Sequence, residues 1–192
     1  MSLTHRLLLR MFGRPSGVLG RLGGRIMARM NEACARWAIG VLDIGPNDAV
    51  LEVGFGCGVA VALLAARASK GHVAGIDVSR EMVAQASARN RAAIDAGRVE
   101  LRHGSALGLP FAAASFDKAL AVNLMQLWPD VGKGLSELAR VLKARGRVAL
   151  AFTPHSGQQQ ARLAGALAAA GFVDATLVES EDGFCATAMK PG

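Results

Sequence analysis

The stretch "VLEVGFGCGVA", residues 50–60, decides how this chain folds. It starts in a short apolar run over 49–53, passes through glycines at positions 54, 56 and 58, and enters a helical pattern near Val59. Alternate glycines allow a tight strand-to-helix turn and leave bare backbone amides at the start of the helix, where a nucleotide-like ligand can lie. The stretch therefore predicts the first strand–helix unit of a ligand-binding α/β sheet.

Outward from this unit, short apolar runs alternate with longer helical patterns, which is typical of a parallel sheet with helices on both faces. Asp182 and Gly183 separate the last two runs with no helix between them, so we expect a terminal hairpin. The prediction is an α/β, Rossmann-like, doubly wound sheet, mostly parallel, with one antiparallel strand from the C-terminal hairpin. The seven expected strands are residues 49–53, 72–76, 98–102, 118–122, 147–152, 173–179 and 184–189.

Capping residues mark the expected helix ends. Ser79 and Asp130 are predicted N-caps, and Gly97 is predicted to close the helix that Ser79 begins. Ser156 and Gly171 are expected to bracket the last helix. The helix after Asp130 is expected to have one apolar face and a basic C-terminal end, formed by Leu135, Leu138, Val141 and Leu142 and by Arg140 and Lys143.

Composition limits the class of protein. The chain has 192 residues, of which 52% are apolar and 19% charged, enough for one packed domain. No apolar run approaches the ~20 residues that a membrane span needs. The three cysteines are far apart and lack metal-ligand spacing, so we expect reduced thiols, no metal site and a cytoplasmic protein.

The positive charge lies at the N-terminus. The net charge is +7, but residues 1–31 contain six arginines and no acidic residue. Because the rest of the chain is nearly neutral, nucleic-acid binding is disfavoured. We expect residues 1–45 to form a helical arm or lid and residues 46–192 to form the ligand-binding domain. For residues 1–16, closure of an apolar pocket is favoured over peripheral contact with a membrane surface.

Two acidic residues indicate the kind of ligand. Glu52 precedes Gly54 by two positions, where a carboxylate would repel a pyrophosphate but accept a hydrogen bond from an ammonium group. Asp77, in "GIDVS" (residues 75–79), ends the second expected strand, where a carboxylate can hold a ribose diol. Val59 also stands where a dinucleotide-binding fingerprint would have its third glycine. These features disfavour a nicotinamide-dependent oxidoreductase.

Residues 50–58 and 75–79 resemble the class I S-adenosylmethionine-dependent methyltransferases, as do "GSALGLPFAAASFD" (104–117), "AVNLMQLWPD" (121–130) and "ELARVLKARGRVAL" (137–150). Within that class, the chain is similar to the small-molecule enzymes related to quinone-biosynthesis methyltransferases. The resemblance covers about residues 48–190. It implies S-adenosylmethionine as cofactor, S-adenosylhomocysteine as product, and transfer of a methyl group to an acceptor molecule.

The resemblance also implies roles for individual residues. The glycine loop would lie under the methionine moiety, with Glu52 at its amino-acid end, and Asp77 would hold both ribose hydroxyls. Val78 would flank the adenine and Ser105 with Ala106 would lie at its edge, where the family usually has an aspartate. Asn123 would face the methyl group. The implied cofactor-binding residues are Glu52, Gly54, Phe55, Gly56, Gly58, Asp77, Val78, Ser105, Ala106 and Asn123.

The sequence offers two candidate catalytic residues and limits the class of acceptor. Asn123 and His155 are the candidate catalytic residues, His155 as a base at the carboxyl end of the sheet. Residues 123–126 read Asn-Leu-Met-Gln, which disfavours acceptors that are methylated on an amide or exocyclic nitrogen. The apolar N-terminal segment favours a small or lipophilic acceptor. The alternative is a non-catalytic module that binds the cofactor or docks to a membrane.

Overall fold

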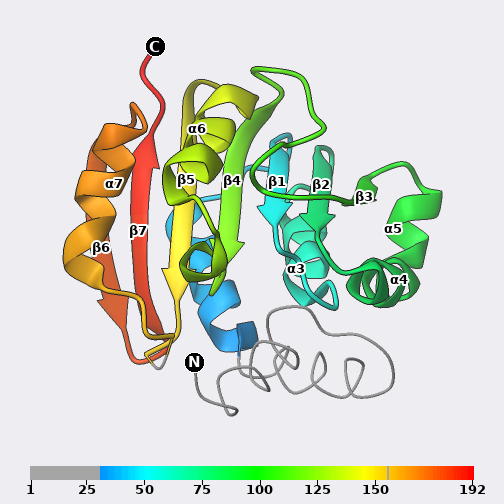
Figure 1. Cartoon of the computed structure of the whole chain (residues 1–192). Coiled ribbons are helices and arrows are strands. Elements are labelled where there is room, and N and C mark those ends of the chain that lie inside the picture. The colour runs from blue at the N-terminus through cyan, green and yellow to red at the C-terminus, as the bar shows by residue number, and fades with distance from the viewer. Residues whose placement is uncertain (1–30, 155) are drawn as a thin grey trace.

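One seven-stranded sheet forms the centre of the computed structural model, which describes residues 31–154 and 156–192 (Figure 1). Its strands follow the order β3-β2-β1-β4-β5-β7-β6. Only β7 runs antiparallel to its neighbours, so the predicted sheet with one antiparallel strand is confirmed. The strands are β1 (Ala49–Val53), β2 (His72–Asp77), β3 (Val99–His103), β4 (Phe116–Val122), β5 (Leu142–Phe152), β6 (Val173–Ser180) and β7 (Gly183–Met189).

Helices cover both faces of the sheet (Figure 1). One face packs against the helix over residues 31–42 together with α3 and α4, and the other packs against α6 and α7. The bounds are α3 (Val59–Arg67), α4 (Arg80–Arg89), α5 (Arg91–Asp95), α6 (Val131–Val141) and α7 (Leu163–Ala169), with short 3₁₀ turns η2 (Met125–Leu127) and η3 (Gln160–Arg162).

Strand β1 lies at the point where the order of the sheet reverses. The chain runs from β1 outward to β2 and β3, then returns to β4 on the other side of β1. Ligands of open α/β sheets bind outside the carboxyl ends of the strands at such a reversal. Successive side chains of a strand point to opposite faces, so Leu51 and Val53 enter the core beside α6, and Glu52 enters the core on the side of Val50 and α3.

Most predicted helix ends are confirmed. The Ser79 hydroxyl accepts a hydrogen bond from the Met82 backbone N–H, and the Asp130 carboxylate accepts one from that of Lys133. Gly97 and Gly171 have φ values of 70° and 86°, which suits glycine after a helix end. The residues between Ser79 and Gly97 form two helices rather than one, because the chain breaks at Asn90.

Two expected helix boundaries are wrong. Ser156 caps no helix, since Gly157 has a φ of 75° and α7 begins only at Leu163. Helix α6 ends at Val141, so Leu142 and Lys143 belong to β5, which starts five residues before the expected strand at 147. The Lys143 ammonium therefore does not lie at a helix end; it donates to the carboxylate of Asp117 on β4, at 2.8 and 2.9 Å.

The N-terminal part of the described chain belongs to the packed body. In the helix over residues 31–42, Cys34, Ala38 and Leu42 are buried against the same core cluster as α3. The expected arm over residues 1–45 is described only from residue 31 onward, so the segment 1–16 lies outside the described residues. Within residues 31–154 and 156–192, no helix combines the length and apolarity needed to cross a membrane.

Candidate functional site

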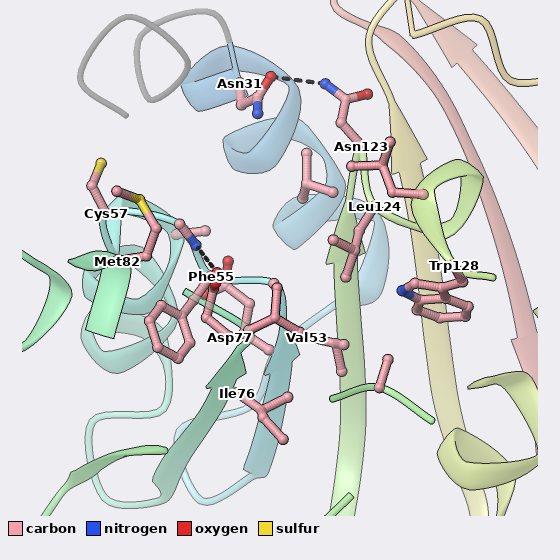
Figure 2. Close-up of a pocket in the computed structure, with 18 of the residues that line it drawn as sticks. Asn31, Val53, Phe55, Cys57, Ile76, Asp77, Met82, Asn123, Leu124 and Trp128 are labelled. Carbon is pink, nitrogen blue, oxygen red and sulfur yellow. Dashed lines mark hydrogen bonds between the residues drawn. The ribbon is translucent and has the colours of Figure 1, made fainter. Parts of the chain in front are cut away.

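A cavity opens at the carboxyl ends of β1, β2 and β4, where the strand order reverses (Figure 2). Nine of the ten residues expected to bind the cofactor line it, and Gly58 does not. The fold thus gathers side chains from the glycine loop, the end of β2, the segment after β3 and the end of β4. The nine are Glu52, Gly54, Phe55, Gly56, Asp77, Val78, Ser105, Ala106 and Asn123.

The three glycines of the loop serve different purposes, although all have positive φ values between 52° and 78°. A Cβ on Gly56 would meet no atom within 4 Å, so the loop turns its open side to the cavity there. A Cβ on Gly58 would lie 2.7 Å from that of Ala86, because Gly58 faces α4. A Cβ on Gly54 would lie 2.5 Å from a methyl group of Leu124. Only Gly56 leaves open space for a ligand.

Asp77 ties the glycine loop to the end of β2. Its carboxylate accepts a hydrogen bond from the backbone N–H of Gly56 (Figure 2) and another from that of Ser79, each at 2.9 Å. Desolvation raises the pKa of Asp77, and these two backbone hydrogen bonds oppose that rise. The residue is 8% exposed and borders the cavity, so lone pairs not used by the loop remain available to a ligand.

Glu52 brings an unsatisfied carboxyl oxygen to the cavity wall. The residue is 3% exposed, and its Oε2 is buried with no hydrogen-bond partner among residues 31–154 and 156–192. Burial in the apolar core, and secondarily the nearby charge of Asp77, raises the pKa of Glu52 to about 8. Two acids at one cavity wall, one of them unpaired, suit a ligand that brings positive charge and hydrogen-bond donors.

The segment after β3 forms another wall of the cavity. Gly104 donates its N–H to the carbonyl of Asp77 at 2.9 Å, and Ser105 pairs with Gly108 in an isolated bridge. The Ser105 hydroxyl accepts from the Leu107 N–H at 3.2 Å. Val78 is 46% exposed at the rim. This wall offers a small hydroxyl and apolar surface rather than a carboxylate.

Asn123 lines the cavity at the end of β4, with a φ of 49°. Its Oδ1 accepts from the Thr153 N–H at 2.9 Å, and its Nδ2 donates to Asn31 Oδ1 at 2.8 Å and to Thr153 Oγ1 at 3.0 Å. Both amide hydrogens are therefore engaged within the protein. This geometry suits a positioning role better than proton transfer.

The other reactive side chains of the region give no catalytic group. His155 lies outside the described residues. Cys57 lines the cavity but is 5% exposed, and desolvation raises the pKa of its thiol. A thiol kept neutral in this way is a poor nucleophile.

The sequence does not indicate several of the residues that line the cavity. Asn31, Glu32 and Ala35 come from the helix over 31–42, which the sequence assigns only to a general arm. Leu124, Leu127 and Trp128 follow β4. The Trp128 indole packs so closely on α6 that a Cβ on Gly134 would lie 2.5 Å from it. Such contacts depend on the packing of distant segments, and no local pattern in the sequence indicates them.

Comparison with known proteins gives one consistent result. Residues 50–146 match the family described as the methyltransferase domain. The uncharacterized methyltransferase YdaC of Bacillus subtilis is 32% identical over 182 residues, covering 88% of this chain and 98% of that protein. A ubiquinone/menaquinone biosynthesis C-methyltransferase of Geotalea daltonii is 34% identical over 116 residues, 60% of this chain and 49% of that protein. In fold, the chain is similar to a SAM-dependent methyltransferase of Aquifex aeolicus, with a TM-score of 0.74, 23% identity, and coverage of 84% and 92%.

Proposed function

This chain belongs to the methyltransferase domain family, as a class I S-adenosylmethionine-dependent enzyme, and from that premise we propose that it methylates a small or lipophilic acceptor in the cavity beside β1. When bound, S-adenosylmethionine supplies an electrophilic methyl group on a positively charged sulfur. The remaining work of the protein is to bind, to orient both reactants in line and to keep water away.

The residues of the cavity fit this cofactor. The unpaired Oε2 of Glu52 suits the ammonium of the methionine moiety, and the open side of Gly56 leaves space for its chain. Asp77 would hold the ribose hydroxyls, because its carboxylate is anchored by the loop and still borders the cavity. Val78, Ser105 and Ala106 would flank the adenine.

The observation that carries the proposal is the pair of buried acids, Glu52 and Asp77, at the edge of a glycine loop. A pyrophosphate at this wall would meet two carboxyl groups and no lysine or arginine from the described residues. A ligand with an ammonium and a diol meets complementary groups instead. This contrast favours S-adenosylmethionine over a nicotinamide dinucleotide.

The proposal of a small or lipophilic acceptor rests on the walls beyond the glycine loop. They include Met82, Leu124, Leu127 and Trp128, and the Leu127 side chain is 43% exposed. The name of the Geotalea relative supports a small-molecule acceptor. An apolar acceptor can displace water from these walls, which favours its binding near the methyl group.

Calorimetric titration with S-adenosylhomocysteine and with NAD tests the cofactor assignment. We expect S-adenosylhomocysteine to bind and NAD not to bind. Asp77→Ala should weaken S-adenosylhomocysteine by about 10- to 150-fold, since it removes hydrogen bonds to a charged group worth roughly 1.5–3 kcal/mol.

The matched control is Asp95→Ala, which removes an exposed carboxylate that pairs with Arg91 on α5. Its affinity should equal that of the wild type, with circular dichroism confirming that both variants are folded. Equal affinity in the Asp77 variant would contradict the ribose assignment. Incorporation of labelled methyl groups into separated apolar and aqueous metabolite fractions then tests the class of acceptor.

A further inference from the structure

The amide of Asn31 is oriented by a chain of hydrogen bonds that begins at β5. The backbone N–H of Thr153 can only donate, and it donates to Oδ1 of Asn123 at 2.9 Å. Nδ2 of Asn123 therefore faces the helix over 31–42, where it donates to Oδ1 of Asn31 at 2.8 Å. Because Asn31 must present its oxygen to Asn123, its own Nδ2 faces away from that bond.

The two hydrogens on Asn31 Nδ2 are not used by the described residues. The one hydrogen bond of the Asn31 side chain within this part of the chain is the one from Asn123. Asn31 lines the cavity, and Figure 2 shows its nitrogen on the side away from Asn123. The bond to Asn123 thus fixes a hydrogen-bond donor at the cavity wall.

The charges around the cavity show which ligand group needs this donor. The charged side chains among its described lining residues are all acidic: Glu32, Glu52 and Asp77. An amino-acid moiety carries an ammonium, for which Glu52 is suited, and a carboxylate, for which these acids are not. Asn31 lies one helical turn before Ala35, which packs in the core cluster on the Glu52 face of the sheet. The helix that carries Asn31 therefore lies on the same face of the sheet as the Glu52 side chain, and both residues line the cavity.

A second donor without a partner in the described part of the chain, Nε1 of Trp128, lies on the opposite face of the sheet. The Trp128 indole packs in the core cluster of Val53 and α6, whereas Glu52 points to the other face. An amino-acid moiety whose ammonium contacts Glu52 can therefore place its carboxylate against Asn31 more readily than against Trp128.

We propose that Asn31 binds the α-carboxylate of S-adenosylmethionine through Nδ2, with Asn123 and Thr153 holding the amide in this orientation. The inference rests on the proposed function, because it takes the cofactor as given. It assigns a binding contact to Asn31 and a positioning role to Asn123.

Two probes isolate this contact. S-Adenosylhomocysteine carries the amino-acid moiety, and 5′-methylthioadenosine has the same nucleoside and thioether without it. By calorimetry, we expect Asn31→Ala to weaken S-adenosylhomocysteine by about 10- to 100-fold, as the loss of a hydrogen bond to a charged group predicts, and to leave 5′-methylthioadenosine unchanged. Asn47→Ala, the same change at an exposed loop position, should alter neither.

Two further variants test the orientation. Asn31→Asp keeps the oxygen that faces Asn123 but replaces the donor by a carboxylate oxygen, so S-adenosylhomocysteine should bind more weakly than to Asn31→Ala. Asn123→Asp places an acceptor opposite Asn31 and should reverse its amide. Asn123→Asp alone should lower the affinity for S-adenosylhomocysteine. In the double variant with Asn31→Ala, it should lower the affinity little further.

Unchanged affinity of Asn31→Ala for S-adenosylhomocysteine would overturn the inference, as would equal losses for both probes. Additive effects in the double variant would overturn the positioning role of Asn123. These failures differ from failure of the proposed function itself, in which the wild type would bind neither probe.

Discussion

Two regions of this protein, one partly buried and one fully buried, use a glutamate in opposite ways. At the junction of α6 with the segment before β4, Glu137 accepts hydrogen bonds from Arg140 and from the Leu109 N–H, at 2.7–2.8 Å. Its pKa is lowered to about 2, chiefly by the hydrogen bonds from Arg140. In the cavity, Glu52 has a buried oxygen that no described residue pairs with, and burial raises its pKa to about 8.

The difference separates a structural carboxylate from one that we propose binds the cofactor. Arg140 also donates to the carbonyls of Leu109 and Phe111, so the charge of Glu137 helps hold the segment after β3 against α6. Glu52 stabilises no neighbour in this way, and an unpaired polar group in a core costs free energy. The unpaired carboxyl of Glu52 therefore does not stabilise the fold. Because it lies beside Gly56 and Asp77 at the cavity, we infer that it contacts a ligand.

The largest loss of ligand affinity should come from placing a side chain in the cavity beside Glu52. Gly56→Val places a branched side chain in the open space that faces the ligand, and we expect S-adenosylhomocysteine affinity to fall more than 100-fold. Calorimetry measures the affinity, and urea denaturation measures the accompanying loss of stability.

The matched control for backbone strain is Gly97→Val. Gly97 has a φ of 70°, against 52° for Gly56, and a Cβ there also meets open space, but it lies between α5 and β3, away from the cavity. Both variants should lose stability, because a β-branched residue at positive φ is strained. Only the Gly56 variant should lose the ligand; similar affinities in the two would contradict the loop assignment.

Replacing each glutamate by glutamine should sharpen the comparison with a smaller effect. Glu52→Gln resembles the protonated acid present near neutral pH, so the free energy of unfolding should change little while S-adenosylhomocysteine affinity falls about 10-fold. Glu137→Gln removes the charge that Arg140 pairs with, so the free energy of unfolding should fall by about 1–2 kcal/mol with affinity unchanged. Urea denaturation and calorimetry on both variants give the four values. Equal changes in stability would remove the distinction between the two regions.

The sheet follows from local pattern because each strand unit carries its own signal. The run at 49–53 and the alternate glycines predict β1 and its turn, and Asp182 with Gly183 predicts the hairpin that makes β7 antiparallel. The start of β5 was missed because Lys143 and Arg145 do not read as a strand, and the pairing of Lys143 with Asp117 depends on tertiary contact. A serine before a helical pattern predicts an N-cap. The sequence does not indicate that the chain turns away at Gly157, so it predicts a cap at Ser156 that the structure lacks.

The sequence indicates the cavity residues that lie beside the ends of strands. Glu52, Gly56 and Asp77 lie beside β-strand ends, so topology brings them together. Gly58 faces α4 instead, which the spacing of the glycines does not reveal. The bond between Asn31 and Asn123 joins residues that are far apart in sequence, and neither residue type indicates the other.

Proton release on binding tests most directly the claim that Glu52 receives the ammonium of the ligand's amino-acid moiety. Glu52 has its pKa raised to about 8, so it is mostly protonated at pH 7, and a bound ammonium favours its charged form and lowers that pKa. Binding should therefore release a proton at pH 7, and affinity should rise as the pH increases from about 6 to 8. Titration of S-adenosylhomocysteine in phosphate and in Tris, which differ in ionisation enthalpy, counts the protons. We predict about one proton released by the wild type and by Glu137→Gln, and about none by Glu52→Gln; binding to the wild type without proton release would contradict the account.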